Sequence, residues 1–234
     1  MLNTNTKTRE FKFDSAHYIK ALFELMKPRV MSLAIFTCVV GFLIAPYKSV
    51  DYLYAILSIT AVALGSGAAG SLNCWYEADV DKVMSRTCLR PIPTGRLTKK
   101  EALIFGVISS FVSVVALYFF SNLMAASLLA LTILFYVFVY TIWLKRKTPQ
   151  NIVIGGAAGA LPPVIGWAIA TGSVSIEPII LFLVIFVWTP SHFWALSLFK
   201  SEDYKKANIP MLPVTSGVET TKKNIFVYSI LLFP

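Results

Sequence analysis

The sequence is poor in charge, because only 14% of its 234 residues are Asp, Glu, Lys or Arg while 56% are hydrophobic. Soluble domains carry about a quarter charged residues, so this composition excludes an ordinary soluble protein. The three cysteines form no CxxC pair, which excludes the usual spacing of zinc and redox sites. The first twenty residues lack an apolar core and include Glu10 and Asp14, which argues against a signal or transit peptide. A mean hydropathy of +0.69 instead predicts an integral membrane protein.

The chain is rich in long apolar runs. A hydrocarbon core is about 30 Å thick, and a helix of about 20 residues crosses it. Because only helices or closed barrels satisfy backbone polar groups in lipid, the runs predict an all-α transmembrane helix bundle. The six predicted spans are Val30–Pro46, Leu53–Leu72, Leu103–Ser121, Leu123–Trp143, Ile152–Thr171 and Pro178–Phe199. A seventh run starts near Ile225 and stops at Pro234, so we expect a truncated chain with about six and a half spans.

Basic residues predict the orientation of the bundle. All of them except Lys48 fall before the first span or in the loops that follow the second, fourth and sixth spans. The positive-inside rule therefore places the N-terminus and these loops in the cytoplasm. A basic face toward anionic headgroups explains the net charge of +9 without nucleic acid. We expect a polar cytoplasmic segment over residues 1–23 and a membrane-embedded domain over residues 24–234.

The scarce acids gather directly after the second span. Asn73, Glu77 and Asp81 are four residues apart and would line one face if the helix continues. Oxygen ligands in this arrangement suit Mg²⁺, which proteins hold with one or two carboxylates plus substrate phosphates. Arg86 and Arg90 add forked donors that match phosphate oxygens. The pattern favours a metal-bridged polyphosphate site, and the alternative is a solvated loop whose acids pair with its bases.

A second polar group follows the sixth span, on the same side of the membrane. His192 lies within an apolar run, and an ionisable residue in a span is a functional candidate, with a structural hydrogen bond as the alternative. Asp203 and Lys206 lie in the loop beyond it.

Asp79 points away from the first motif, toward a second ion or a salt bridge. The small residues of "GSGAAG" (65–70) predict close helix packing, and "GGAAGALPP" (155–163) predicts a kinked span.

Five strings in order resemble a known family, the intramembrane prenyltransferases of the UbiA-like superfamily. They are "ELMKPRVMSL", "NCWYEADVDKVMSRTCLRPIPTG", "YTIWLKRKTPQNIVIGGAAGALPPVIGWA", "WTPSHFWALSLF" and "DYKKANIPMLPV", and they cover most of the chain from Glu24 to Val214. Within the superfamily they are most similar to the branch that farnesylates protohaem IX (haem b). Glu77 replaces the middle aspartate of the first motif. The second motif also departs from the pattern, because Ala207 with Asn208 beside it stands where an aspartate would recur.

The resemblance implies a nine-span bundle around a central cavity, in the bacterial cytoplasmic (inner) membrane. It implies transfer of farnesyl from farnesyl diphosphate to a vinyl group of haem b, which gives haem O for terminal oxidases, with oxidase assembly proteins as partners. The implied site residues are Asn73, Glu77, Asp81 and Asp203 on Mg²⁺, Arg86, Arg90, Lys145 and Lys206 on the diphosphate, and His192 on haem.

Three other functions stay open. Acids at the mouth of a bundle could bind a cation that a transporter carries, although a carrier would also need ionisable residues near the midplane, where His192 is nearly alone. A prenyltransferase with an aromatic acid or quinone acceptor would share the diphosphate residues. A scaffold for oxidase assembly would not need Asn73, Glu77 and Asp81 together.

Overall fold

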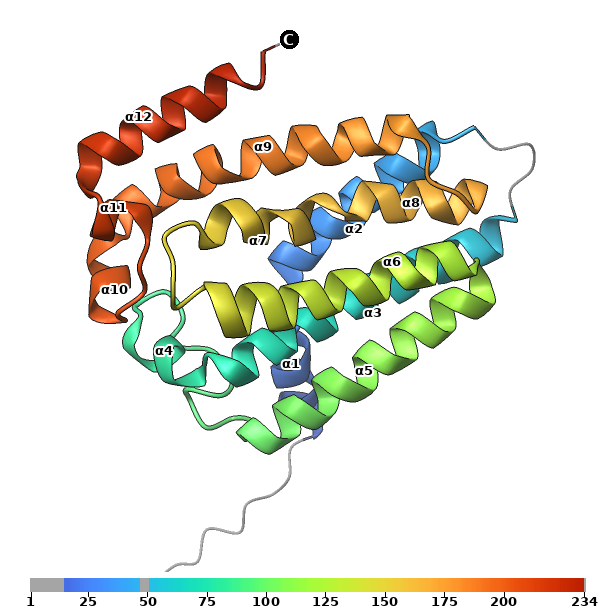
Figure 1. Ribbon diagram of the computed structural model, residues 1–234. Coiled ribbons are helices and arrows are strands. Elements are labelled where there is room, and N and C mark those ends of the chain that lie inside the picture. The colour runs from blue at the N-terminus through green and yellow to red at the C-terminus, as the bar shows by residue number, and fades with distance from the viewer. Residues whose placement is uncertain (1–14, 47–50, 234) are drawn as a thin grey trace, which may run out of the picture.

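The computed structural model describes residues 15–46 and 51–233, and all structural statements concern these ranges. Within them every regular element is a helix, which confirms the predicted all-α bundle (Figure 1). Lys48 and the residues before Ser15 lie outside the described ranges. The expected domain boundary between residues 23 and 24 falls inside the first helix, α1 (Ser15–Leu25).

Five long apolar helices lie close to five of the predicted spans. They are α3 (Tyr52–Tyr76), α5 (Lys99–Phe120), α6 continued by the π-helix η1 (Leu123–Leu134 and Phe135–Leu144), α7 continued by α8 (Asn151–Ala160 and Pro162–Thr171), and α9 (Ile176–Phe199). The remaining predicted span is α2 (Pro28–Ile44), which is bent by 56° from α1. Pro28 is its first residue, where a missing N–H costs nothing.

Shorter helices fill the two long connections. α4 (Ala78–Val83) lies between α3 and α5, while α10 (Ser201–Lys206), α11 (Leu212–Thr215) and α12 (Gly217–Ile230) follow α9. α12 begins well before Ile225, where the seventh apolar run was expected to start. The connections are ordered because they share an apolar cluster, made by Val80, Met84, Ile152, Tyr204, Ile209 and Met211.

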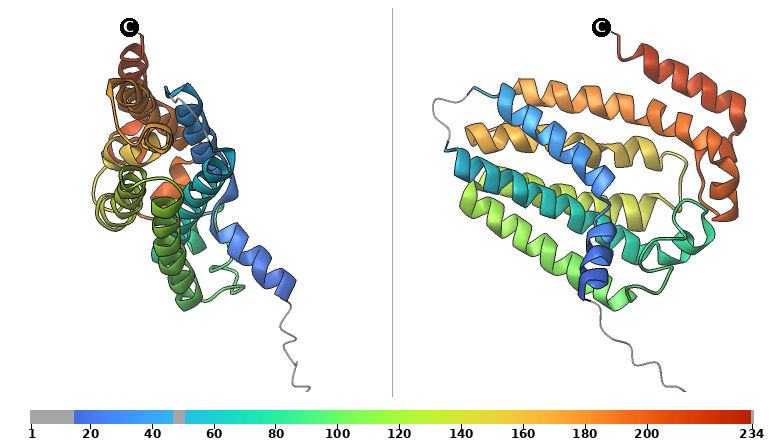
Figure 2. Two further views of the ribbon diagram at one scale, coloured as in Figure 1. Left: turned by 90° about the vertical axis from the view of Figure 1, so that its right-hand side faces the viewer. Right: turned by 180° about the vertical axis from the view of Figure 1, so that it is seen from behind.

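Two spans form the interior of the bundle. The most apolar stretch of α3 is 61% buried and that of α7–α8 is 67% buried, against 22% for α5 and for α9. Figure 2 (left) shows α2 and α3 on one side, α6 and α7–α8 on the other, and α5 and α9 at the two edges. The edge helices therefore turn most of their apolar surface outward, as lipid-facing helices do.

Small residues allow the interior helices to approach closely, as predicted. A Cβ on Gly67 would lie 2.3 Å from the Met26 side chain, and one on Gly166 would lie 1.9 Å from the Cys38 carbonyl oxygen. These contacts fix the α1–α2 bend on α3, and α2 on α8. Within the "GGAAGALPP" segment the fifth span is interrupted at Leu161, between α7 and α8, where the backbone keeps helical angles of φ −75° and ψ −28°.

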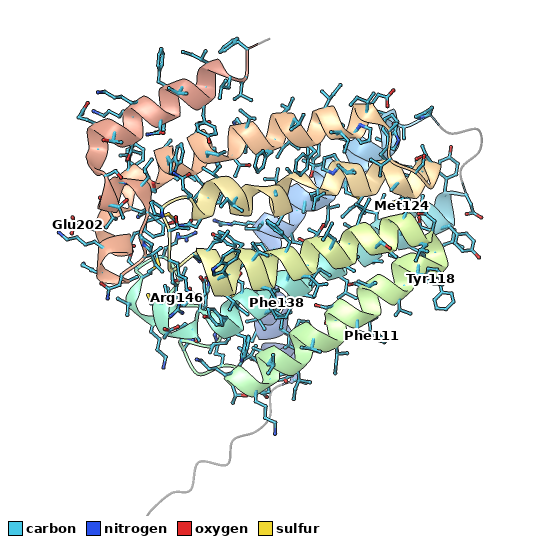
Figure 3. The ribbon with its side chains drawn as sticks, in the orientation of Figure 1. Phe111, Tyr118, Met124, Phe138, Arg146 and Glu202 are labelled. Carbon is cyan, nitrogen blue, oxygen red and sulfur yellow. The ribbon has the colours of Figure 1, made fainter. Side chains whose placement is uncertain are left out.

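The described parts of the long connections lie at one end of the bundle, with α4, α10 and α11 (Figure 1). This end is called the polar end below. Figure 3 labels Arg146 and Glu202 there, while Phe111, Tyr118 and Met124 lie farther along the spans. The two sequence segments that carry the candidate residues therefore meet in space.

Candidate active site

The first acidic motif crosses a helix break. α3 does continue past Leu72, but it ends at Tyr76, and Glu77 has backbone angles of φ −92° and ψ 14° before α4 begins. Backbone hydrogen bonds between residues four apart, as in an α-helix, persist across the break: Glu77 N donates to Asn73 O, and Asp81 N donates to Glu77 O. Asn73, Glu77 and Asp81 consequently remain on the inward side, and each is at most 2% exposed.

Glu77 forms a buried ion pair with Lys145, the residue that follows η1. Lys145 Nζ lies 2.5 Å from each Glu77 carboxylate oxygen and donates a hydrogen bond to Oε2, while Oε1 accepts none. Burial alone would raise the Glu77 pKa, but Lys145 and Lys27 outweigh it and hold that pKa below its ordinary value. Burial would lower the Lys145 pKa, but Glu77 raises it above its ordinary value. Both groups are therefore charged at neutral pH.

Asn73 is held between two partners that the sequence did not reveal. Lys27 donates from Nζ to Asn73 Oδ1, and Asn73 Nδ2 donates to Thr141 Oγ1 at 3.0 Å. Lys27 sits in the bend between α1 and α2 with φ 57° and ψ 64°, a left-handed conformation that non-glycine residues seldom adopt. The bend thus directs the lysine that precedes the first span onto the end of α3.

An apolar cavity of about 120 Å³ opens beside this cluster. Lys27 is the charged residue among the described residues that line it, and Tyr136 of η1 lies at its wall. The Tyr136 ring stacks on Tyr140 at 5.3 Å, and Lys145 Nζ lies 5.8 Å from the centre of the Tyr140 ring. The deeper walls come from α2, α3, α6 and α7–α8 and include Ala34, Val62, Ala69, Leu129, Gly159 and Ile165. The arrangement places a cluster of charged and polar side chains at the opening of an apolar cavity.

The other acids of the first segment also have basic partners. Arg90 Nη1 donates to both oxygens of Asp81 at 2.9 Å. Asp79 points outward, as expected, and accepts two hydrogen bonds from Arg146, which lower its pKa to about 2. The acids do pair with bases, as the solvated-loop alternative required. Asp81 and Glu77 are nevertheless buried, so these pairs do not form a solvated loop.

A hydrogen bond joins the second segment to the first, in addition to the apolar cluster that the two segments share. Ser85 Oγ donates to Asp203 Oδ2 at 2.5 Å, which joins α10 to the loop after α4. Arg86 and Lys206 are exposed, and the described part of the chain gives neither of them an ion-pair partner. The structure therefore brings Asp203 beside the first segment and leaves Arg86 and Lys206 at the surface of the polar end.

His192 lies apart from the cavity lining, on an exposed face of α9. Its ring stacks on Trp188 with 4.3 Å between centroids and 17° between planes, and it meets Phe193 edge-on. The cavity lining contains no residue of α9. His192 therefore presents an exposed aromatic surface that is separate from the cavity.

The donor set fits a hard divalent cation in chemistry. Glu77 Oε1 is a buried carboxylate oxygen that accepts no hydrogen bond, although Lys145 Nζ lies 2.5 Å from it. Asn73 and Asp81, four residues before and after Glu77, carry further buried oxygens. Within residues 15–46 and 51–233, no three His, Cys, Asp or Glu side chains come close enough together to hold a metal ion. Mg²⁺ does not require three such ligands, because substrate phosphates and waters usually complete its shell.

Sequence reasoning missed Lys27, Thr141 and Tyr136. Lys27 precedes a proline at the start of a span, and that position was the available signal for it. Thr141 and Tyr136 lie within "FYVFVYTIWL", an unbroken apolar run with no local signal for a polar contact.

Comparison with known proteins gives one consistent assignment. The UbiA prenyltransferase family matches residues 34–234 of the chain. A protein from Pelagibacter ubique named protoheme IX farnesyltransferase is 64% identical over all 234 residues, which cover 77% of its length. Protoheme IX farnesyltransferase 2 of Mesorhizobium japonicum is 58% identical over 91% of this chain and 67% of its own. A UbiA homologue from Archaeoglobus fulgidus, solved with DMAPP and Mg²⁺, has a TM-score of 0.75 at 19% identity, covering 90% of this chain and 74% of that chain.

Proposed function

The chain belongs to the UbiA prenyltransferase family, and we propose that it transfers a farnesyl group from farnesyl diphosphate to a vinyl group of haem b, giving haem O. Relatives at 58–64% identity carry the name of this activity, which favours haem over an aromatic acid or quinone as acceptor. Membership of a transferase family also disfavours the transporter. The apolar spans make the chain an integral membrane protein.

The observation that carries the proposal is the junction of polar cluster and apolar cavity at the end of α3. Lys27 belongs to both, because it lines the cavity and bonds Asn73. An isoprenyl diphosphate needs this combination, with its anionic head among cations and its hydrocarbon tail among apolar side chains. We expect the diphosphate near Lys27, Lys145 and Arg90, and the chain along α3.

The reaction begins with cleavage of the carbon–oxygen bond of farnesyl diphosphate. The electron pair leaves with the diphosphate, and an allylic cation remains. The vinyl group of haem supplies the electron pair for the new carbon–carbon bond, and water then adds to the resulting cation and releases a proton. Fixed positive groups stabilise the departing diphosphate, an electrostatic effect that usually contributes most to catalysis.

We assign roles to the residues on this basis. Lys145 and Arg90 bind diphosphate oxygens, with Arg86 and Lys206 as outer contacts that the charged substrate would draw inward. Asn73, Glu77 and Asp81 would hold Mg²⁺, which would neutralise charge on the diphosphate. Asp203 would join them only when the bound substrate draws the two polar segments closer, because no three acidic side chains of the described residues lie within reach of one ion. The apolar cavity keeps water from the first cation, since its deeper lining includes Val62, Leu129 and Ile165.

His192 is assigned to haem. Its exposed ring, stacked on Trp188, offers either an axial nitrogen for the iron or a donor for a propionate. We further propose that the domain begins near residue 24 and lies in the bacterial inner membrane. The polar end then faces the cytoplasm, and oxidase assembly proteins take the product.

Mass spectrometry of haem tests the proposal. Membranes from cells that express the protein with its full-length sequence are given haem b and farnesyl diphosphate, and haem is extracted. The expected product is heavier than haem b by one farnesyl group and one hydroxyl group, and its formation requires farnesyl diphosphate. A quinone or aromatic acid that gains farnesyl while haem stays unchanged would refute the haem acceptor.

A further inference from the structure

The side chain of Asn73 has a fixed orientation. Lys27 can only donate hydrogen bonds, so the atom of Asn73 that faces it must be the carbonyl oxygen. The Asn73 amide group Nδ2 must therefore face the other way, where Thr141 Oγ1 accepts its hydrogen bond at 3.0 Å. Asn73 is 1% exposed and Thr141 is fully buried, so bulk solvent does not reach either side chain.

Thr141 differs from other threonines in the spans. A threonine in an α-helix commonly donates its hydroxyl proton to the carbonyl four residues earlier. Thr132 does this in α6, to Leu128 O at 2.7 Å, and Thr189 does it in α9, to Ile185 O at 2.7 Å. Among the described residues, the hydrogen bond from Asn73 is the one that involves the Thr141 hydroxyl.

The π-helix accounts for this difference. Thr141 lies in η1, where the backbone bonds five residues back, as Lys145 N does to Tyr140 O at 2.9 Å. The wider turn moves the preceding carbonyl away from its α-helical place under the hydroxyl. Isolated π turns occur frequently at functional sites. Here the change of helix type directs a threonine hydroxyl across the bundle, onto a residue 68 positions earlier.

We infer that Thr141 is a positioning residue for the diphosphate and metal site: it holds the amide of Asn73 so that Oδ1 points into the polar cluster. The inference rests on the proposed function, which makes Asn73 a site residue. Loss of the hydroxyl acceptor leaves a buried amide N–H without a partner, and the amide then turns away from its place. The effect passes through Asn73, since Thr141 is not itself among the cavity-lining residues.

Binding of a non-reactive substrate analogue tests the inference without turnover. The full chain in lipid nanodiscs is titrated with farnesyl thiodiphosphate by calorimetry, with and without Mg²⁺. Thr141→Val keeps the size of the side chain and removes the acceptor, so Mg²⁺-dependent affinity should fall about tenfold. Thr141→Ser keeps the acceptor and should restore the affinity. The matched control is Thr189→Val, which removes a buried hydroxyl that bonds only its own helix and should bind as wild type.

Each outcome decides the matter. Equal affinities for Thr141→Val and Thr189→Val would overturn the inference, as would failure of Thr141→Ser to restore binding. If Thr141→Val does not fold, Thr141→Cys replaces it, because a thiol is a weak acceptor of similar size and should give an intermediate loss. Wild-type affinity in Thr141→Cys would then overturn the inference. Absence of any analogue binding by wild type would instead refute the proposed function.

Discussion

The buried pair of Glu77 and Lys145 allows stability to be separated from catalysis. Glu77→Gln leaves a lysine ammonium buried without its counter-ion, and Lys145→Met leaves a carboxylate in the same position. The side chains are 1% and 16% exposed, so solvent screens neither charge well. Removal of one partner of a buried pair costs about 3–5 kcal/mol, whereas replacement of both by neutral groups is close to neutral. We expect each single variant to lose about that much stability and the double variant to recover most of it.

The variants should rank differently by activity than by stability. If Glu77 is a site residue as proposed, Glu77→Gln and the double variant should both be inactive, although the double variant is stable. Stability is measured by denaturation of the detergent-solubilised protein, followed by circular dichroism, and activity by the mass of extracted haem. Glu219→Gln serves as a control, because its partner Lys222 is 60% exposed and such pairs contribute about 0–1 kcal/mol. A double variant that turns over at the wild-type rate would refute the role of Glu77.

The pH dependence follows from the same pair. The folded Glu77 pKa lies below its ordinary value, so its ionisation stabilises the fold above the unfolded pKa of about 4.3 and this contribution is lost at lower pH. In Lys145→Met, Lys27 is the main remaining charge that opposes the effect of burial on Glu77. The Glu77 pKa must therefore rise. The acid limb of the pH–stability curve should therefore move to higher pH in this variant. An unmoved acid limb would contradict the assigned coupling.

Three further replacements test separate parts of the site. Asp81→Asn should abolish turnover without loss of membrane insertion, and wild-type conversion of haem b by this variant would remove Asp81 from the metal site. His192→Ala should weaken haem binding, followed by the haem absorption band, more than binding of farnesyl thiodiphosphate; equal losses would argue against a haem-side role. Gly159→Leu adds a side chain at the cavity wall, where a Cβ meets no atom within 4 Å. It should weaken farnesyl diphosphate binding about tenfold and dimethylallyl diphosphate binding far less, whereas equal effects would place the tail elsewhere.

Hydropathy alone predicts most of this fold, for a physical reason. Lipid requires long apolar helices, so the spans appear in the sequence as uninterrupted runs, and the glycine-rich segments mark where helices touch. The break at Glu77 and the π-helix, by contrast, cannot be predicted from hydropathy. The residues of η1 are as apolar as those of an ordinary span, and nothing in their local pattern distinguishes bonds to the fourth residue from bonds to the fifth.

The candidate site also contains residues that the sequence reveals and residues that it does not. Asn73, Glu77 and Asp81 could be found because their spacing follows the helical repeat and their charge is rare in this chain. Their partners could not be found so easily. Lys27 lies 46 residues before Asn73, and Lys145 lies 68 residues after Glu77, so the contacts exist only after the bundle has assembled. The family resemblance implies only a diphosphate contact for Lys145, whereas the structure gives it a direct contact with Glu77.

The balance of buried charge predicts how the site should respond to metal removal. Three cations, Lys27, Lys145 and Arg90, face two carboxylates, Glu77 and Asp81, which leaves the cluster with a net charge of about +1. An isoprenyl diphosphate carries about −3 at neutral pH, because the last pKa of a phosphate ester is about 6. The cluster alone therefore leaves about two negative charges uncompensated in a poorly solvated site.

One Mg²⁺ supplies the two missing charges, so diphosphate binding should depend steeply on the metal. Chelation with EDTA should weaken farnesyl thiodiphosphate binding by at least about a hundredfold, since buried uncompensated charge costs several kcal/mol. Readdition of Mg²⁺ should restore the affinity, with one equivalent bound per diphosphate. The neutral alcohol farnesol is the matched control, because its tail fills the same cavity without a charged head. Tight, EDTA-resistant binding of the diphosphate would show that the side chains suffice, and the charge assignment of the cluster would then be wrong.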